Sequence, residues 1–164
     1  MIMKYLKEKL FWKKEFNEKH FFFVEYDEQR DYYSFIKEMI DKKYYQTVIT
    51  SDIMLEYIES IATIGNIYID KIEMMEEDDE FSKIVEDIVS RCITNRGALI
   101  ELVKMLQYLD EESSVDIKTI YLHEEHQNKI IMGYIQVNGI IGISSPNSQM
   151  VEALLRCVKE CLGE

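Results

Sequence analysis

The pattern that most constrains the fold of this chain lies near its C-terminal end, where an Asn-Gly pair separates two apolar runs. Alternating apolar residues precede Asn138-Gly139, and a second run follows over 140–144. Because Asn and Gly both tolerate positive φ, the pair predicts a type I′ turn between two antiparallel strands. Ser145 is then expected to cap a helix with Pro146 at its first position, and Gly163 to end it. The chain is thus expected to close on a β-hairpin and one amphipathic helix.

Upstream of this hairpin, helical and strand patterns alternate at short intervals. Strands are predicted over 21–26, 45–50 and 67–72, and helices over 31–43 and 53–64, the second one capped by Ser51 or Asp52 and ended by Gly65. Two further helices, over 79–92 and 96–109, and a strand starting at Val115 lead into the hairpin. Strand–helix–strand–helix–strand order favours parallel pairing through crossover helices. We therefore expect an α/β fold, with α+β as the alternative: a mixed sheet flanked by helices, βαβαβ in its first half.

The first 19 residues differ in charge from the rest of the chain. They hold six lysines and three acids, whereas the whole chain has a net charge of −12, so the remainder carries −15. Helical periodicity over 3–17 predicts a basic amphipathic helix within 1–19, with either a solvated or a docking role. An acidic body repels phosphate backbones, which makes nucleic acid an unlikely partner.

Few residues interrupt the chain. One proline and six glycines leave no linker, so 1–164 is expected to form a single domain. The chain has three cysteines, no apolar stretch of membrane-spanning length and no signal-peptide pattern at Met1. We expect a cytoplasmic protein without a transmembrane segment.

The motifs of common cofactor sites are absent. There is no GxGxxG, GxxxxGK[ST] or GxSxG pattern, so no cofactor is expected. The acidic run 76–80 is interpreted as a solvated helix start, because it lacks the glycine and spaced oxygen ligands of a calcium loop. His123 and His126 with Cys157 and Cys161 could in principle bind zinc, but buried thiols and loop histidines are the simpler interpretation, and no metal is expected.

One segment resembles the phospholipase D signature. His126-Gln127-Asn128-Lys129 precedes an apolar run, and a Gly-Ile-Ser-Ser-Pro-Asn stretch ends at Asn147. The resemblance implies His126 as a nucleophile on phosphorus, with Lys129 and Asn147 holding phosphate oxygens. It would cover 21–147 and implies a homodimeric phosphodiesterase or nuclease. The chain departs from the signature in the His–Lys spacing, which is three residues here instead of two, and in Tyr134, which stands where an aspartate is expected.

The last fifty residues also resemble the end of roadblock-type dimerisation modules. Such modules bind partners, catalyse nothing, and need a strand pair earlier in the chain, which the sequence does not make obvious. Because no complete catalytic constellation is present, we expect a non-catalytic regulatory, adaptor or ligand-sensing module. It would work through contacts with a protein partner or with itself as a homo-oligomer. The alternative is the phospholipase D-like phosphodiesterase.

Overall fold

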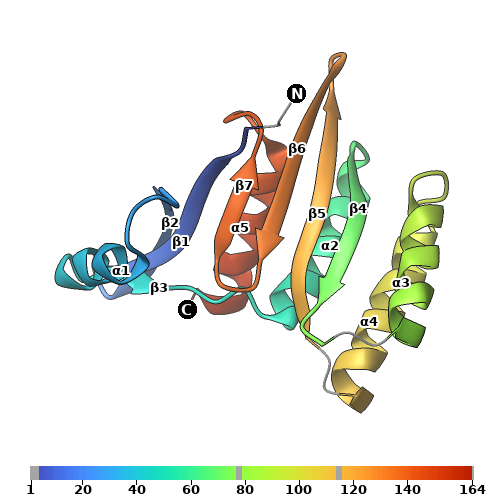
Figure 1. The fold of residues 1–164 in the computed structure, drawn as a ribbon, viewed down its shortest axis with the longest axis horizontal. Helices are drawn as coiled ribbons and strands as arrows, with labels where there is room; N and C mark the ends of the chain where they lie inside the picture. The colour runs from blue at the N-terminus through green and yellow to red at the C-terminus, as the bar shows by residue number, and fades with distance from the viewer. Residues whose placement is uncertain (1–3, 77–78, 114–115, 164) are drawn as a thin grey trace.

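A computed structural model describes residues 4–76, 79–113 and 116–163, and one antiparallel sheet runs through its centre (Figure 1). The described strands are β1 (Leu6–Glu15), β2 (Glu18–Glu25), β3 (Tyr45–Gln46), β4 (Ile67–Met74), β5 (Ile117–His126), β6 (Lys129–Gln136) and β7 (Ile140–Ile143). The described helices are α1 (Tyr32–Asp41), α2 (Ser51–Ile64), α3 (Asp79–Cys92), α4 (Ala98–Ser113) and α5 (Gln149–Leu162). The strand order is β2-β1-β7-β6-β5-β4, and β3 pairs with β1.

This arrangement confirms the α/β class and the strand–helix order of the first half, but the predicted parallel pairing is wrong. Each strand pair among the described residues is antiparallel, so the sheet is not mixed. The reason is that β3 and β4 do not become neighbours. β3 is two residues long and pairs with β1, whereas β4 pairs with β5 at the far edge of the sheet. A short interval between strands therefore did not imply adjacency here.

The N-terminal helix predicted within 1–19 is also wrong, because 6–15 form the strand β1. Residues 1–3 lie outside the described part. Three consecutive residues of β1, Lys9, Leu10 and Phe11, are buried, so both of its faces are covered. β1 pairs with β2, β3 and β7. Pairing on both sides and burial of both faces outweigh the helix propensity of its Lys, Glu and Leu residues.

Two hairpins have two-residue turns in which both residues have a positive φ, as type I′ turns require. The φ angles are 50° at Phe16 and 66° at Asn17 in the first, and 46° at Gln127 and 68° at Asn128 in the second. The β6–β7 hairpin at Asn138-Gly139 is confirmed, but its turn is not type I′. Only Gly139 has a positive φ, at 84°, at the end of a three-residue loop.

The helix ends follow local capping rules, with two shifts from the predicted caps. Thr50, rather than Ser51 or Asp52, caps α2, and Gly65 ends it at φ 90° as predicted. Ser148, rather than Ser145, caps α5, where its side-chain oxygen accepts a hydrogen bond from the backbone N–H of Met150 at 3.1 Å. Residues 146–148 therefore belong to the connection between β7 and α5 and not to the helix.

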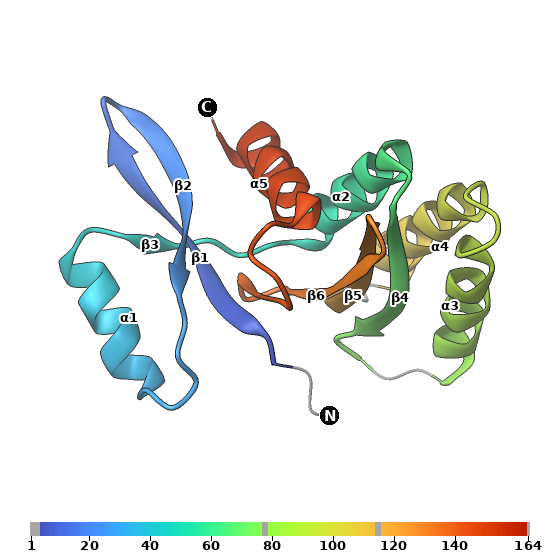
Figure 2. The same ribbon diagram turned by 90° about the horizontal axis from the view of Figure 1, so that it is seen from above.

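The two faces of the sheet are covered differently. The larger core joins one face to α2, α4 and α5, and α3 packs against α4 and the β4 edge. On the opposite face, α1 covers only the β1–β2 end, where Phe11 contacts Phe35 edge-on with ring centroids 5.8 Å apart. Figure 2 shows α2 and α5 on one side of the sheet and α1 on the other. Among the residues that the structure describes, no helix lies on the opposite face of β4 to β7 (Figure 1).

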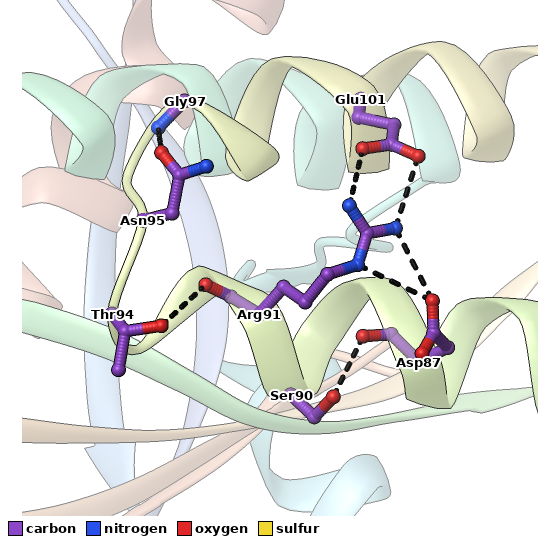
Figure 3. A network of polar contacts seen from close by, with 7 residues as sticks. All are labelled: Asp87, Ser90, Arg91, Thr94, Asn95, Gly97 and Glu101. Carbon is purple, nitrogen blue, oxygen red and sulfur yellow. Dashed lines mark hydrogen bonds and ion pairs between the residues drawn. The ribbon is translucent and has the colours of Figure 1, made fainter.

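A guanidinium joins α3 to α4 (Figure 3). Both terminal nitrogens of Arg91 donate to the carboxylate of Glu101, at 2.8 and 3.0 Å, and its Nε donates to Asp87 at 3.2 Å. In the connection between the helices, Asn95 accepts a hydrogen bond from the backbone N–H of Gly97 at 3.0 Å. These contacts orient the two helices beside the sheet.

Candidate functional site

The uncovered part of the sheet is the candidate site, and we call it the open sheet face. Side chains of directly paired residues in an antiparallel sheet point to the same side. One row across the strands follows the pairs Lys7–Gly142, Gly142–Tyr134, Tyr134–Tyr121 and Tyr121–Lys71. A second row contains Tyr68, His123 and Met132. The face is thus built from aromatic side chains with a lysine at each end of the first row.

No helix of the described residues packs on these aromatic side chains. Tyr121, His123, Met132 and Tyr134 are half-buried, and none of them belongs to either hydrophobic cluster or packs against one. Their partial burial comes from their neighbours in the same face. A sheet face that is aromatic and lacks a covering layer is a feature of interaction surfaces.

Tyr134 lies flat on the sheet because the residue opposite it is a glycine. A Cβ atom at Gly142 would lie 2.3 Å from the Tyr134 ring, so any other residue would lift the ring away. Tyr5 meets the ring of Tyr134 edge-on, with centroids 5.2 Å apart, and Tyr121 lies 6.2 Å away. Burial, and then Tyr5 and Tyr26 nearby, raise the pKa of Tyr134. Its phenol therefore stays neutral and presents an apolar ring with one hydroxyl.

Tyr121 is held in place by an acid. Its hydroxyl donates to a carboxylate oxygen of Glu73 on β4, and Lys71 lies 5.7 Å from the ring centroid. The hydrogen bond to Glu73, followed by burial, raises the pKa of Tyr121 to about 12. Glu73 and Lys71 therefore restrict the ring, and less conformational entropy remains to be lost on binding.

His123 is also oriented by an acid. A bulge in β4 brings Asp70 to the open sheet face, where its carboxylate lies 2.7 Å from Nδ1 of His123. Nε2 lies 3.8 Å from Glu125, and Tyr68 stacks on the ring at 5.0 Å. The free cysteines of the described chain, Cys92, Cys157 and Cys161, lie on α3 and α5 instead. Among the described residues, no cysteine lies on the open sheet face beside the His–Asp pair.

The three residues of the phospholipase D resemblance lie elsewhere. His126 and Lys129 are paired across the Gln127-Asn128 turn at the exposed end of the β5–β6 hairpin. The chain reverses direction between them. Asn147 is exposed in the connection between β7 and α5, and no hydrogen bond or ion pair within 4–76, 79–113 and 116–163 joins it to either residue.

Metal ligands do not assemble within the described ranges. Among these residues no group of three or more His, Cys, Asp and Glu side chains could hold a metal ion. Residues 77 and 78 of the acidic run lie outside the described part, and α3 begins at Asp79 as expected. The acids at 79 and 80 stand in its first turn, where they favour the positive end of the helix dipole.

Sequence reasoning did not identify the tyrosine row, although a signal for it exists. In β5 and β6, half-polar aromatic residues such as Tyr121 and Tyr134 alternate with buried Ile and Leu. This alternation indicates one buried face and one face of a different character. Only the pairing register shows that the aromatic residues of separate strands meet.

Comparison of the chain with protein-family models, curated proteins and solved structures gave no significant match. Over the residues that the structure describes, no helix has the length and apolar character needed to cross a membrane. The functional argument therefore depends on the geometry of the open sheet face.

Proposed function

We propose that this protein is a non-catalytic regulatory or adaptor module that binds a partner protein through the open sheet face. The observation that carries the proposal is the placement of Tyr134. Its ring lies over Gly142 and between Tyr5 and Tyr121, and no helix in the described part of the chain covers it. An aromatic row of this kind supplies a large apolar contact area, while its hydroxyl groups remain able to form hydrogen bonds.

The chemistry of the face favours a protein partner over a substrate. Tyrosine is enriched at protein interfaces because its ring is rigid and amphipathic. The acids on the face have partners within the chain: Asp70 contacts His123, and Glu73 accepts from Tyr121. Lys7 contacts Glu28, and Lys71 lies over the Tyr121 ring. A face whose acids are already paired offers few free groups for proton transfer, whereas its aromatic rings remain available for packing.

The strand order supports the roadblock-type resemblance in the one feature that the sequence did not make obvious, the upstream strand pair. That resemblance needs a strand pair upstream of the closing strands, and β1 and β2 lie beside β7 as such a pair. This support concerns only the order of the strands in the sheet. It supports a module that binds partners over one that catalyses a reaction.

The proposal is tested by replacing one tyrosine on the open sheet face and one elsewhere. Tyr134→Ser removes the central ring, and Tyr108→Ser removes a ring on α4 that is 53% exposed and lies away from the face. Proteins that co-purify with each full-length variant from the native host are quantified against wild type. We expect Tyr134→Ser to lose a specific partner that Tyr108→Ser retains.

A partner set that is unchanged in Tyr134→Ser would contradict this assignment. Circular dichroism and urea unfolding of both variants establish that the comparison is made between folded proteins. If both variants lose the same partner, the binding surface does not lie on the open sheet face.

A further inference from the structure

The tip of the β1–β2 hairpin exposes an aromatic ring in a backbone conformation that disfavours it. Phe16 is 99% exposed and has a φ of 50° at the first position of the two-residue turn. Positive φ is uncommon for bulky side chains, and Asn, Asp or Gly would fit the position better. Neither folding nor solubility favours a phenylalanine here, so the exposed ring is a candidate for contact with another molecule.

Two lysines next to the turn add a second unfavourable feature. Lys14 and Lys19 are paired directly across the hairpin, so their side chains point to the same side. Neither forms an ion pair with a described residue, although Lys19 lies 5.1 Å from the centroid of the Trp12 ring. Like charges facing each other destabilise a hairpin. Glu15 and Glu18, the pair next to the turn, point to the opposite side of the hairpin, and Glu15 forms an ion pair with Lys13. The tip thus presents an apolar ring with two lysines on one side of the hairpin.

A groove with complementary properties runs between α2 and α4. One part of it, about 300 Å³ in volume, is lined by the apolar side chains of Ala62, Leu99, Ile100 and Val103. Ile100 is 63% exposed at its rim. A groove of this volume with an apolar lining is large enough to receive a phenyl ring.

The groove continues into an acidic part. Glu59 and Gln107 line both parts, and the second, of about 290 Å³, adds Glu56, Asp110 and Glu111. Burial and the acids around it raise the pKa of Asp110, which indicates crowded negative charge. Lys104 is the one basic residue among the described side chains that line the groove. Positive charge entering from outside would relieve this repulsion.

We propose that the β1–β2 hairpin tip of one copy of this chain docks into the α2–α4 groove of a second copy. Phe16 enters the apolar part, and Lys14 and Lys19 approach the acids of the groove. The occupant is a second copy because both complementary surfaces belong to the same chain. This surface is separate from the open sheet face, and the proposal does not depend on the proposed function.

The hairpin and the groove are different patches of the molecule. The hairpin lies beside α5, whereas the groove lies between α2 and α4, with Cys161 of α5 lining its acidic part. Two copies can exchange hairpins reciprocally in a closed two-fold dimer, or a head-to-tail contact can continue to a ring or an open chain of copies. Self-association to a dimer or beyond is therefore expected as concentration rises.

Two variants separate the surfaces without disturbing the core. Phe16→Asn with Lys19→Glu disables the hairpin, and asparagine suits a positive φ, so the turn is retained. Ile100→Asn with Glu59→Lys disables the groove at two exposed positions. Ile130→Asn with Lys37→Glu is the control, because Ile130 is 64% exposed and neither residue lines the groove or the hairpin tip.

Sedimentation velocity over a concentration series measures assembly of the full chain. We expect wild type and the control to self-associate, more weakly at high salt, and each disabled variant to associate roughly thirtyfold more weakly or worse. An equimolar mixture of the two disabled variants should form a one-to-one complex with twice the 19.6 kDa mass of one chain and nothing larger. This rescue is expected because the mixture retains one intact hairpin and one intact groove.

Three results would overturn the proposal: a wild type that stays monomeric at millimolar concentration, disabled variants that still assemble, or a mixture that does not form the one-to-one complex. Flotation with phosphatidylserine vesicles and titration with single-stranded DNA are run in parallel. Hairpin-dependent binding to either one, with a monomeric wild type, would assign the hairpin tip to that ligand instead.

Discussion

The ammonium group of Lys9, in the middle of β1, donates a hydrogen bond to the backbone carbonyl of Asn138 in the turn between β6 and β7. Lys9 is 1% exposed, and no carboxylate among the described residues forms an ion pair with it. The rings of Phe11 and Tyr32 each lie 6.0 Å from its Nζ. A buried cation thus links β1, the β6–β7 turn and the start of α1.

This placement makes stability depend on pH. Burial lowers the pKa of Lys9 from 10.5 to about 8 in the folded protein. Below pH 8 both states carry the proton, and burial of the charge costs stability. Between pH 8 and 10.5 only the unfolded chain keeps the proton, so the contribution of Lys9 to the free energy of unfolding rises with pH. The full shift corresponds to about 3 kcal/mol.

Lys9→Met isolates this effect, because it keeps the apolar stem and removes the charge. We expect the free energy of unfolding of wild type, minus that of the variant, to rise by up to about 3 kcal/mol from about pH 7 to above pH 10. Urea unfolding at several pH values measures it. The subtraction removes the contributions of other groups that titrate in this range. A difference that does not change with pH would show that the ammonium is not desolvated.

Tyr134 and Gly142 supply a second prediction. A Cβ atom at position 142 would lie 2.3 Å from the Tyr134 ring, so Gly142→Ala must displace that ring. We expect a loss of about 1–3 kcal/mol in the free energy of unfolding, which is the usual cost of overpacking. In a Tyr134→Ser background the same substitution should cost much less. Urea unfolding of the four proteins in this double-mutant cycle measures the coupling, and additive losses would contradict the contact.

The sequence was informative where local rules decide structure. Gly65 ends α2 because only glycine readily takes its left-handed conformation, and the boundaries of α3 follow from its apolar periodicity. The C-terminal hairpin was predictable from Gly139, although the turn type was not. Two residues of positive φ were assumed, but the third residue of a longer loop carries it alone.

The sequence was misleading where distant segments decide structure. Residues 6–15 lack the apolar–polar alternation of a half-buried strand, because Lys9, Leu10 and Phe11 are all buried in a strand covered on both faces. Their apolar residues recur instead at a spacing that fits a helix. The position of β4 beside β5 depends on α2, α3 and α4 packing together, which no local pattern contains. The same limit applies to the open sheet face. Tyr121 and Tyr134 stand on different strands, and their contact exists only once the register is set.

The Arg91–Glu101 contact predicts that the α3–α4 pair loosens in acid. The hydrogen bond from Arg91 lowers the pKa of Glu101, so the contact contributes stability above the ordinary glutamate pKa and loses it as pH falls through the lowered value. Amide hydrogen exchange in α3 and α4 at about pH 7 and about pH 3 measures this. Glu101→Gln should weaken protection at neutral pH and remove most of its pH dependence. Equal protection of wild type and variant at neutral pH would argue against the contact.

Replacing Glu124 is expected to lower the free energy of unfolding strongly. Its side chain is 1% exposed and accepts hydrogen bonds at the N-terminus of α5. One of its oxygens accepts hydrogen bonds from the hydroxyl of Ser148 and the backbone N–H of Met150, both at 3.2 Å. Glu124→Ala removes this acceptor and leaves a cavity, which we expect to cost about 2–4 kcal/mol in urea unfolding. Glu124→Gln keeps an acceptor oxygen and should cost less. Similar losses in the two variants would show that the charge, not the hydrogen bonds, is what matters.

Replacing His126 is expected to leave phosphodiester cleavage unchanged. This result would distinguish the proposed binding module from a phosphodiesterase. A phospholipase D-like reaction would need His126 to attack phosphorus while Lys129 and Asn147 hold the phosphate oxygens. His126 and Lys129 lie at an exposed hairpin end, and no described hydrogen bond or ion pair connects either residue to Asn147. We therefore expect wild type and His126→Ala to cleave bis(p-nitrophenyl) phosphate equally, at the background rate. Cleavage above background by wild type that His126→Ala abolishes would establish catalysis at this hairpin. A matched Gln127→Ala variant at the same turn would show whether any loss comes from the imidazole or from the turn itself.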